Sequence, residues 1–102
     1  MIQTQIKDGI CILFPPANFN FSCHRVFRDA YQNLPDDACI RGFVLDFKDT
    51  EYLDSAALGM MLLLRKVAQE NRQTVEIINV HGVVKDVLRI ARFQDLFDWN
   101  EA

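Results

Sequence analysis

The chain has 102 residues, half of them hydrophobic and a quarter charged, which is the composition of one globular domain with a sizeable core. Its formal net charge of −3 and its scattered Lys and Arg residues argue against a nucleic-acid-binding surface. No stretch reaches the roughly 18 to 20 apolar residues of a membrane span, and the polar N-terminus differs from a signal peptide. We therefore expect a single domain over residues 1–102, without membrane insertion.

Residues 2–14 are predicted to form a β-hairpin. The segment IQTQI alternates apolar and polar residues, as a half-buried strand does, and ICILF follows after the tight-turn dipeptide Asp8-Gly9. Pro15 and Pro16 are expected to end the second strand, because proline has no N–H to donate to a strand ladder.

A first helix is predicted within NFNFSCHRVFRDAYQNL, residues 18–34. Ser22 is the expected N-cap, and Phe21 and Val26 have the spacing of a hydrophobic staple. One apolar face then follows at helical spacing, formed by Phe27, Ala30, Tyr31 and Leu34. LPDDAC is predicted to be a loop.

The remaining segments alternate between strands and helices. GFVLDF, residues 42–47, is typical of a strand buried on both faces, and the acidic connector KDTEYLD leads to a helix predicted from about Ser55 to Asn71. TVEIINV predicts another strand. VVKDVLRIARF predicts a third helix with one apolar face, formed by Val83, Val84, Val87, Leu88 and Ala91. LFDW is expected either to form a short last edge strand or to dock on the body.

The predicted order of elements is β-β-α-β-α-β-α, with the short final strand as an addition. Strands joined through helices by right-handed crossovers are parallel, and the N-terminal hairpin makes the sheet mixed. The fold class is therefore predicted to be α/β, in a single domain.

No catalytic, cofactor or metal site is predicted. Neither of the glycine-rich phosphate-binding signatures is present, and the two histidines, His24 and His81, lack paired ligand spacings. Cys11, Cys23 and Cys39 are odd in number and widely spaced, which indicates free thiols in a reducing cytoplasm. We expect a cytoplasmic protein that is not an enzyme and needs no cofactor.

Four acids crowd the segment that follows the GFVLDF strand: Asp46, Asp49, Glu51 and Asp54. Loops at the carboxyl ends of parallel strands are where α/β folds place ligands. Asp46 invites comparison with the phospho-accepting aspartate of receiver domains, but the acidic pair that receivers carry after their first strand is missing. We interpret the segment as a solvated acidic loop.

Ser55 has two readings, as an N-cap in competition with Asp54 or as a site where an added phosphate switches binding. At about 100° per residue, the core face of its helix holds Ala57, Met60, Met61, Leu64, Val67 and Ala68. The Ser55 side holds Leu58, Gly59, Leu62, Lys66, Gln69 and Glu70, with Leu63 at its margin.

The apolar residues on the Ser55 side also have two readings. A neighbouring helix could cover Leu58 and Leu62, or they could form a docking patch beside the hydroxyl. Gly59 costs the helix roughly 0.5–1 kcal/mol relative to Ala, and the close approach of another chain or helix would explain its presence. A phosphate of about −1.5 to −2 charges is stabilised at a helix N-terminus, yet it would oppose docking on Leu58 and Leu62.

The segment GFVLDFKDTEYLDSAALGMMLLLRKVAQE resembles the central motif of STAS domains, and most closely that of the anti-sigma factor antagonists. A buried strand ends in an acid, a connector follows, and D-S-x-x-L-G opens a helix. INVHGVVKDVLRIARFQDLF is similar to the family's last strand, third helix and closing segment. The resemblance implies a STAS fold over most of the chain.

The resemblance also implies a partner-switching function. The serine of the motif, here Ser55, would be phosphorylated by a partner serine protein kinase, often itself the anti-sigma factor, and restored by a PP2C-type phosphatase. The unphosphorylated form would bind the anti-sigma factor and so release a sigma factor. The partner-binding residues carried over are Asp54, Leu58, Gly59, Leu62 and Lys66.

Departures from the family pattern leave some points open. Ala56 and Ala57 leave Ser55 as the one hydroxyl of the motif, and Thr50 is a weaker second acceptor. Similar stand-alone domains also serve as accessory subunits that dock to the ATPase of ABC-type lipid transporters, where phosphorylation is unnecessary. We expect a monomer when the protein is free.

Overall fold

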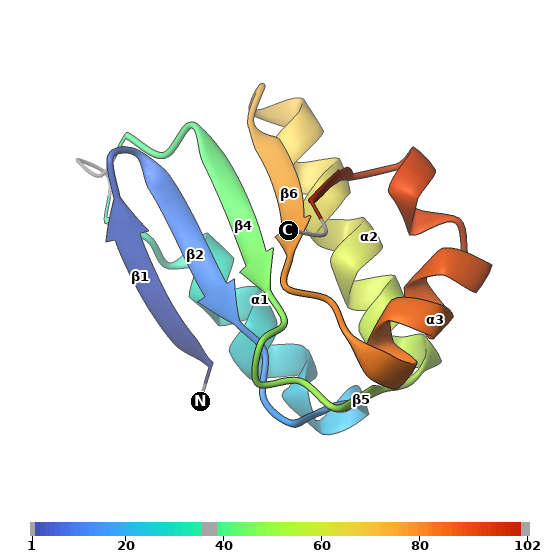
Figure 1. Ribbon diagram of the computed structural model, residues 1–102. Coiled ribbons are helices and arrows are strands. Elements are labelled where there is room, and N and C mark those ends of the chain that lie inside the picture. Colours follow the sequence, from blue (N-terminus) through green and yellow to red (C-terminus); the bar gives the residue numbers. More distant parts are fainter. Residues whose placement is uncertain (1, 36–38, 101–102) are drawn as a thin grey trace.

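The computed structural model describes residues 2–35 and 39–100 of the chain. A five-stranded mixed sheet has the order β1-β2-β4-β6-β7 (Figure 1). Its strands are β1 (Gln3–Lys7), β2 (Ile10–Phe14), β4 (Gly42–Asp46), β6 (Thr74–Ile78) and β7 (Asp98–Asn100). β1 is antiparallel to β2, and the other neighbours are parallel. The predicted α/β fold with a mixed sheet is confirmed.

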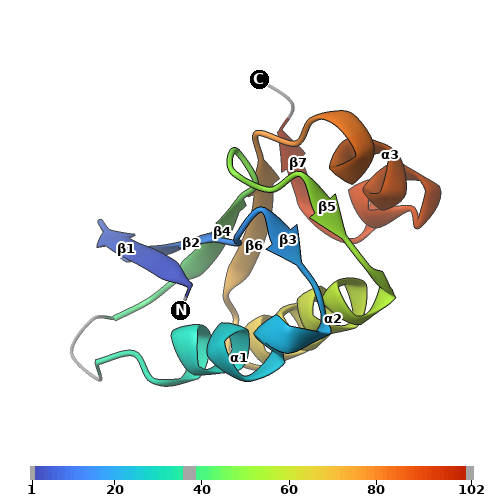
Figure 2. The ribbon, with the colours of Figure 1, turned by 90° about the horizontal axis from the view of Figure 1, so that it is seen from below.

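Three α-helices complete the fold: α1 (His24–Gln32), α2 (Ser55–Glu70) and α3 (Gly82–Ile90). Figure 2 shows α1 and α2 together below one face of the sheet, while α3 lies to the side, near β5 and β7. Two 3₁₀ turns, Phe21–Cys23 and Phe93–Asp95, flank α1 and α3. The predicted helix from Ser55 ends at Glu70, one residue earlier than expected.

The N-terminal hairpin forms as predicted, with all five residues of β1 paired to β2, but β1 is exposed along its whole length and not half-buried as expected. Asp8 and Gly9 both have positive φ, 54° and 80°. Two consecutive left-handed residues define the tight turn whose twist matches that of the paired strands, which is why Asp-Gly favours hairpins. The hairpin makes β1 the edge of the sheet.

The core lies between the sheet and the α1–α2 layer. Phe43 and Leu45 of β4 point into it, and α2 contributes its predicted core face. Of that face, Val67 is half-buried and the others are buried: Ala57, Met60, Met61, Leu64 and Ala68. Within β4 all residues except half-buried Val44 are buried, in line with the apolar GFVLDF run.

Three local predictions at the first and third helices were wrong. Ser22 is not an N-cap, because a 3₁₀ turn precedes α1 and Asn20 caps that turn by accepting a hydrogen bond from the Ser22 N–H. Phe21 is 72% exposed, so it forms no buried staple with Val26. Val83, predicted on the apolar face of the third helix, is 54% exposed, whereas Val84 and Leu88 are buried.

Two features were not predicted or were left open by the sequence. Asn18–Phe19 (β3) and Tyr52–Leu53 (β5) pair in parallel as a separate two-stranded sheet. The closing segment does form an edge strand, because β7 pairs with β6 from Asp98 onward. Residues 36–38 of the predicted LPDDAC loop lie outside the described residues.

Candidate functional site

The N-terminus of α2 is capped by Asp54, which leaves Ser55 as the first helical residue. Asp54 Oδ1 accepts a hydrogen bond from the Ala57 N–H at 2.9 Å, the usual N-cap interaction. Ser55 is exposed. The competition between the two residues for the cap is therefore decided in favour of Asp54, and the Ser55 hydroxyl is not needed for it.

Asp54 also connects α2 to a distant segment. Its second oxygen, Oδ2, accepts a hydrogen bond from the Phe21 N–H at 3.3 Å, and its own N–H donates to the Phe19 carbonyl at 3.3 Å. The β3–β5 pairing sets this register by placing Phe19 opposite Leu53. The turn before α1 is thereby held beside Ser55.

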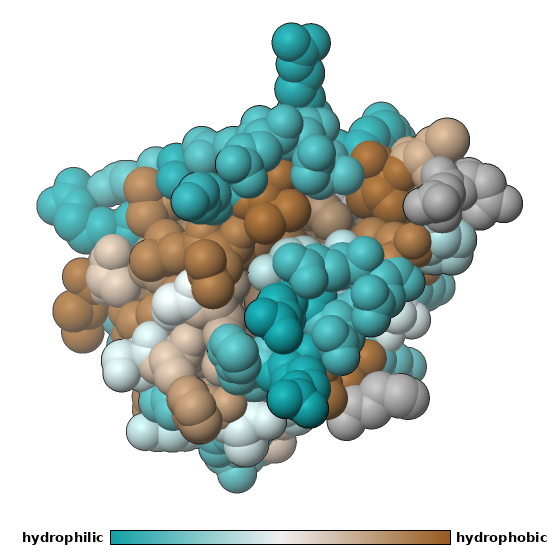
Figure 3. Space-filling view, turned by 180° about the vertical axis from the view of Figure 1, so that it is seen from behind, coloured by the Kyte–Doolittle hydropathy of each residue, from teal (hydrophilic) through white to brown (hydrophobic). Residues whose placement is uncertain are grey.

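The outer side of α2 is an apolar and largely uncovered surface. Leu62 is 41% exposed and Leu63 is 51% exposed, while Leu58 is half-buried against the core. Leu62 is therefore not buried under another helix, whereas Leu63 lies on the α1 side of α2, where it lines a small cavity with Phe27 and Tyr31. Figure 3 shows hydrophobic surface gathered over α2, next to the hydrophilic side chains of α1. We name the exposed residues Ser55, Gly59, Leu62, Leu63 and Lys66 the α2 outer face.

Gly59 has no packing neighbour that requires it. A Cβ atom built at this position meets no atom within 4 Å, apart from the helix's own nearby backbone, and no positive φ is present there. The close approach that would explain the glycine is therefore absent within the described chain. It leaves a flat, open place on the α2 outer face.

Exposed aromatic residues near Ser55 were missed by the sequence reasoning. Phe21 is held near the start of α2 by its N–H bond to Asp54, and its ring stacks on His24 with centroids 6.1 Å apart. Tyr52, three positions before Ser55, is 50% exposed. Their common location depends on the two-residue strands β3 and β5, which are too short to produce a periodic signal.

Thr50 and Asp46 have structural roles. Thr50 is fully buried and its hydroxyl donates to the Pro15 carbonyl at 2.9 Å, so it is inaccessible as a second acceptor in the folded protein. Asp46 is buried, and its Oδ1 accepts hydrogen bonds from the Lys48 N–H and the Asn79 side chain, both at 3.0 Å. The interpretation of this acid as solvated was wrong, because it closes the turn after β4.

Within the described ranges, no cluster of three or more His, Cys, Asp or Glu residues could hold a metal ion. No helix in the same part of the chain is long and apolar enough to cross a membrane. The cysteines are free thiols, and burial raises the pKa of Cys11 to about 11. A thiol with that pKa stays protonated at neutral pH and is a poor nucleophile.

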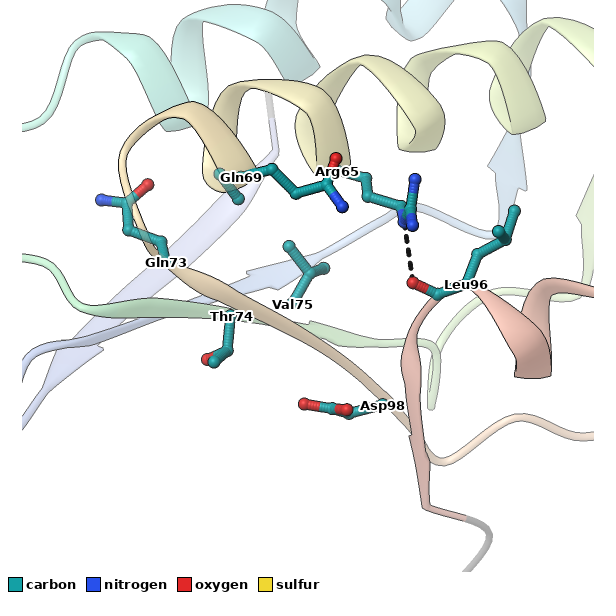
Figure 4. A pocket seen from close by; sticks show the side chains of 8 residues that line it. Arg65, Gln69, Gln73, Thr74, Val75, Leu96 and Asp98 are labelled. Carbon is teal, nitrogen blue, oxygen red and sulfur yellow. Dashed lines mark hydrogen bonds between the residues drawn. The ribbon is translucent and has the colours of Figure 1, made fainter.

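A shallow groove of about 170 Å³ lies on the flank of α2 that faces β6 and β7 (Figure 4). Arg65 projects into it from α2, and its Nε donates to the Leu96 carbonyl at 2.8 Å. Arg65 stands ten positions after Ser55, roughly 15 Å along the helix. The groove is thus separate from the α2 N-terminus, and its Arg65 contact fastens the closing segment to α2.

The two bonds of Asp54 predict a measurable contribution to stability. Asp54→Ala should lower the free energy of unfolding by about 1–2 kcal/mol, because the first turn of α2 loses its cap. Thermal unfolding followed by circular dichroism should show a midpoint lower by roughly 4–8 °C for each kcal/mol. Asp54→Asn is the matched control, since Asn caps helices as well as Asp does. Equal losses in both variants would contradict the capping role.

Comparison with known proteins identifies the family. The STAS domain family model matches residues 1–101. A STAS-domain containing protein of Pseudomonas aeruginosa (strain UCBPP-PA14) is 39% identical over 81 residues, which cover 79% of this chain and 78% of that protein.

Solved structures with the same fold include anti-sigma factor antagonists. A Thermotoga maritima protein provisionally assigned to that class has a TM-score of 0.81 at 17% identity, with 99% of this chain and 86% of that chain covered. Unphosphorylated SpoIIAA has a TM-score of 0.77 at 12% identity, covering 100% and 89%. Phosphorylated SpoIIAA from Bacillus has a TM-score of 0.74 at 9% identity, covering 99% and 92%. At these identities the likeness shows the fold, and together with the family match it leads to one conclusion: the chain belongs to the STAS domain family.

Proposed function

We propose that this protein is an anti-sigma factor antagonist whose binding is switched off by phosphorylation of Ser55. One observation carries the proposal: Ser55 is an exposed hydroxyl at a helix N-terminus that a different residue caps. The uncovered Leu62 lies on the same side of α2. The site therefore combines an accessible acceptor with a surface suited to a protein partner.

The helix geometry accommodates a phosphate without unfolding. The first-turn N–H groups of α2 and the positive end of its dipole stabilise negative charge. Added to Ser55, about −1.5 to −2 charges would lie next to the Asp54 carboxylate in the chain. A docked partner would have to desolvate this charge, so binding weakens while the conformation is kept.

The partner surface extends over the α2 outer face and its margins. Leu62, Gly59 and Lys66 offer an exposed contact area, with half-buried Leu58 at its edge and Asp54 holding the helix start. The exposed aromatic rings of Phe21 and Tyr52, which were not predicted from the sequence as part of the site, enlarge this surface near Ser55. Large side chains of this kind dominate the energy of protein interfaces.

The partners follow from this switch. The unphosphorylated form binds an anti-sigma factor that is also a serine kinase, which releases a sigma factor, and a PP2C-type phosphatase reverses the modification. The protein acts in the cytoplasm by binding rather than by catalysis, so ATP and its metal ion belong to the kinase. The existence of SpoIIAA structures in both phosphorylation states supports a switch on this fold.

The proposal is tested by mapping phosphate on the native protein. Trypsin cleaves after Lys48 and Arg65, so residues 49–65 form one peptide that contains Ser55 and Thr50. We expect mass spectrometry to place phosphate on Ser55 and none on buried Thr50. An unmodified peptide across growth phases and stresses, with phosphatases inhibited, would contradict the switch and favour the transporter-subunit alternative.

A further inference from the structure

The sheet has one face that the α-helices leave open. Figures 1 and 2 show α1 and α2 on one side of the sheet and α3 near its β7 edge. The opposite side of β1, β2, β4 and β6 is left uncovered by these helices. When one face of a sheet lies in the core and the other in water, the outward positions are normally polar. The open face here departs from that rule.

Apolar side chains occupy the centre of the open face. In β2 and β4 the residues directed at the helices are buried, and the alternate residues point the other way. Residues paired across strands share a face, so the register assembles a patch from three strands. We name it the open-face patch; its half-buried members are Ile10, Ile12, Phe14, Val44 and Ile78.

The strand sequences support the need for a cover on this side. Every residue of β2, Ile10–Phe14, is apolar, which is the pattern of a strand that is covered on both faces. In the structure the helices α1 and α2 cover only one of the two faces of β2. A layer that packs on the open-face patch would complete the arrangement that the sequence encodes.

Charges of opposite sign border the patch on its two sides. Lys7 of β1 pairs with Ile10 and so stands on the same face. On the other side, Glu76 of β6 pairs with Val44, and Asp98 of β7 pairs with Glu76. The face is therefore basic on one flank and acidic on the other, with an apolar middle at one end of which the Lys48 ammonium lies over the Phe14 ring, 5.0 Å from its centroid.

We propose that the open face is a self-association surface on which a second copy of the chain packs face to face. A two-fold axis parallel to the strands, between β2 and β4, exchanges the two flanks of the face. Ile12 then meets Val44 of the partner subunit in the middle of the contact. Lys7 then lies two residues along the strand direction from the position opposite Glu76 of the partner subunit. The two-fold axis repeats this pairing of opposite charges, so it occurs twice in the dimer.

The charges also select the orientation of the two copies. A two-fold axis running across the strands, through the centre of the patch, would instead place Glu76 over Glu76 of the partner subunit. Like charges opposite one another are unfavourable, and rim charges of this kind fix the register of an interface. The strand-parallel axis gives the aligned packing that is common between sheets.

The size of the face makes the dimer weak. Four strands about 4.8 Å apart and five residues at about 3.3 Å each span roughly 19 by 17 Å. A standard interface buries about 800 Å² on each partner, so this contact is small. The protein should be monomeric in dilute solution, as expected for the free form, and dimeric at high concentration. The α2 outer face lies on the other side and stays accessible, so the dimer does not depend on Ser55.

Sedimentation equilibrium of the full chain, from about 10 μM to 1 mM, tests the proposal. The wild type should fit a monomer–dimer equilibrium. The double variant Ile12→Thr/Val44→Thr keeps β-branched side chains while adding polar groups, and it should raise the dissociation constant about tenfold or more. Leu62→Gln/Leu63→Gln on the opposite face is the matched control and should leave dimerisation unchanged.

Charge reversal tests the orientation with variants that leave the apolar centre intact. Lys7→Glu and Glu76→Lys should each raise the dissociation constant about tenfold, and the combined swap should restore it to within about threefold. Circular dichroism confirms that each variant is folded. A wild type that stays monomeric at 1 mM overturns the proposal. So does a dimer that survives the patch variant but is lost in the Leu62/Leu63 control, or a swap that fails to restore association.

Discussion

Ser55→Ala is expected to bind the anti-sigma partner constitutively, whereas Ser55→Asp is expected to bind it at least about 100-fold more weakly. The alanine variant keeps the exposed docking surface and removes the acceptor, so no phosphate can form there. The aspartate variant places a permanent charge at the start of α2, beside Asp54 and within reach of a docked partner. The aspartate variant binds more weakly because its added charge would have to lose its hydrating water in the complex.

Affinity purification of tagged variants from the source organism, with quantitative mass spectrometry, measures this difference. The recovered partner should be a protein with a serine-kinase ATP-binding domain. Ser22→Ala is the control, because Ser22 is the only other serine and its hydroxyl already donates to Asn20 at 2.6 Å. Both Ser55 variants should melt no lower than the wild type, since Asp at a helix N-terminus is favourable. Equal partner recovery by the two variants would count decisively against the switch.

Two substitutions of Gly59 are expected to have different effects, one on the stability of the protein and the other on its binding to the partner. Gly59→Ala should raise the free energy of unfolding by about 0.5–1 kcal/mol, because alanine is the better helix former and its methyl group meets open space. Gly59→Gln should also fold, yet its long side chain would stand in the middle of the α2 outer face. We expect it to weaken the anti-sigma partner about 100-fold.

Thermal unfolding and the same affinity purification provide the two measurements. The control is Asp86→Gln, which places the same side chain at an exposed position of α3. Asp86→Gln should shift the melting temperature by no more than a few degrees and should leave the recovery of the partner unchanged. Partner binding unaffected by Gly59→Gln would move the docking surface away from α2, and a Gly59→Ala variant that melts lower would contradict the open environment of the glycine.

Long periodic segments allowed the fold to be predicted. The hairpin, the buried β4 strand and α2 follow from hydrophobic patterns that persist over five or more residues, and tertiary packing agrees with them. The D-S-x-x-L-G motif then gave the family, and the match over residues 1–101 confirmed it. These are the parts of the chain where local sequence and global fold agree.

Short elements and adjacent polar residues could not be resolved in the same way. The strands β3 and β5 have only two residues each, which is too short for an alternating hydrophobic pattern. The hydrogen bond between Phe21 and Asp54 could therefore not be predicted from the sequence. Asn20 and Ser22 are both good caps, and only the 3₁₀ turn decides between them. Exposure at the margin of a helix depends on neighbours that are distant in sequence. The exposure of Val83 was therefore predicted incorrectly, and the sequence alone did not decide whether another helix covers Leu62.

The bond from the Phe21 N–H to Asp54 has a consequence for the insulation of related signalling pathways. A cell with several similar switch proteins must prevent each kinase from modifying the wrong substrate. Here the surroundings of Ser55 are set partly by a turn whose Phe21 lies 33 residues before Asp54 in the chain. If Ser55 is the phosphoacceptor that we propose, substitutions in that turn change which kinase fits, while the D-S-x-x-L-G motif itself stays constant. Under the proposed switch, paralogues therefore acquire different kinase partners before their binding mechanism changes.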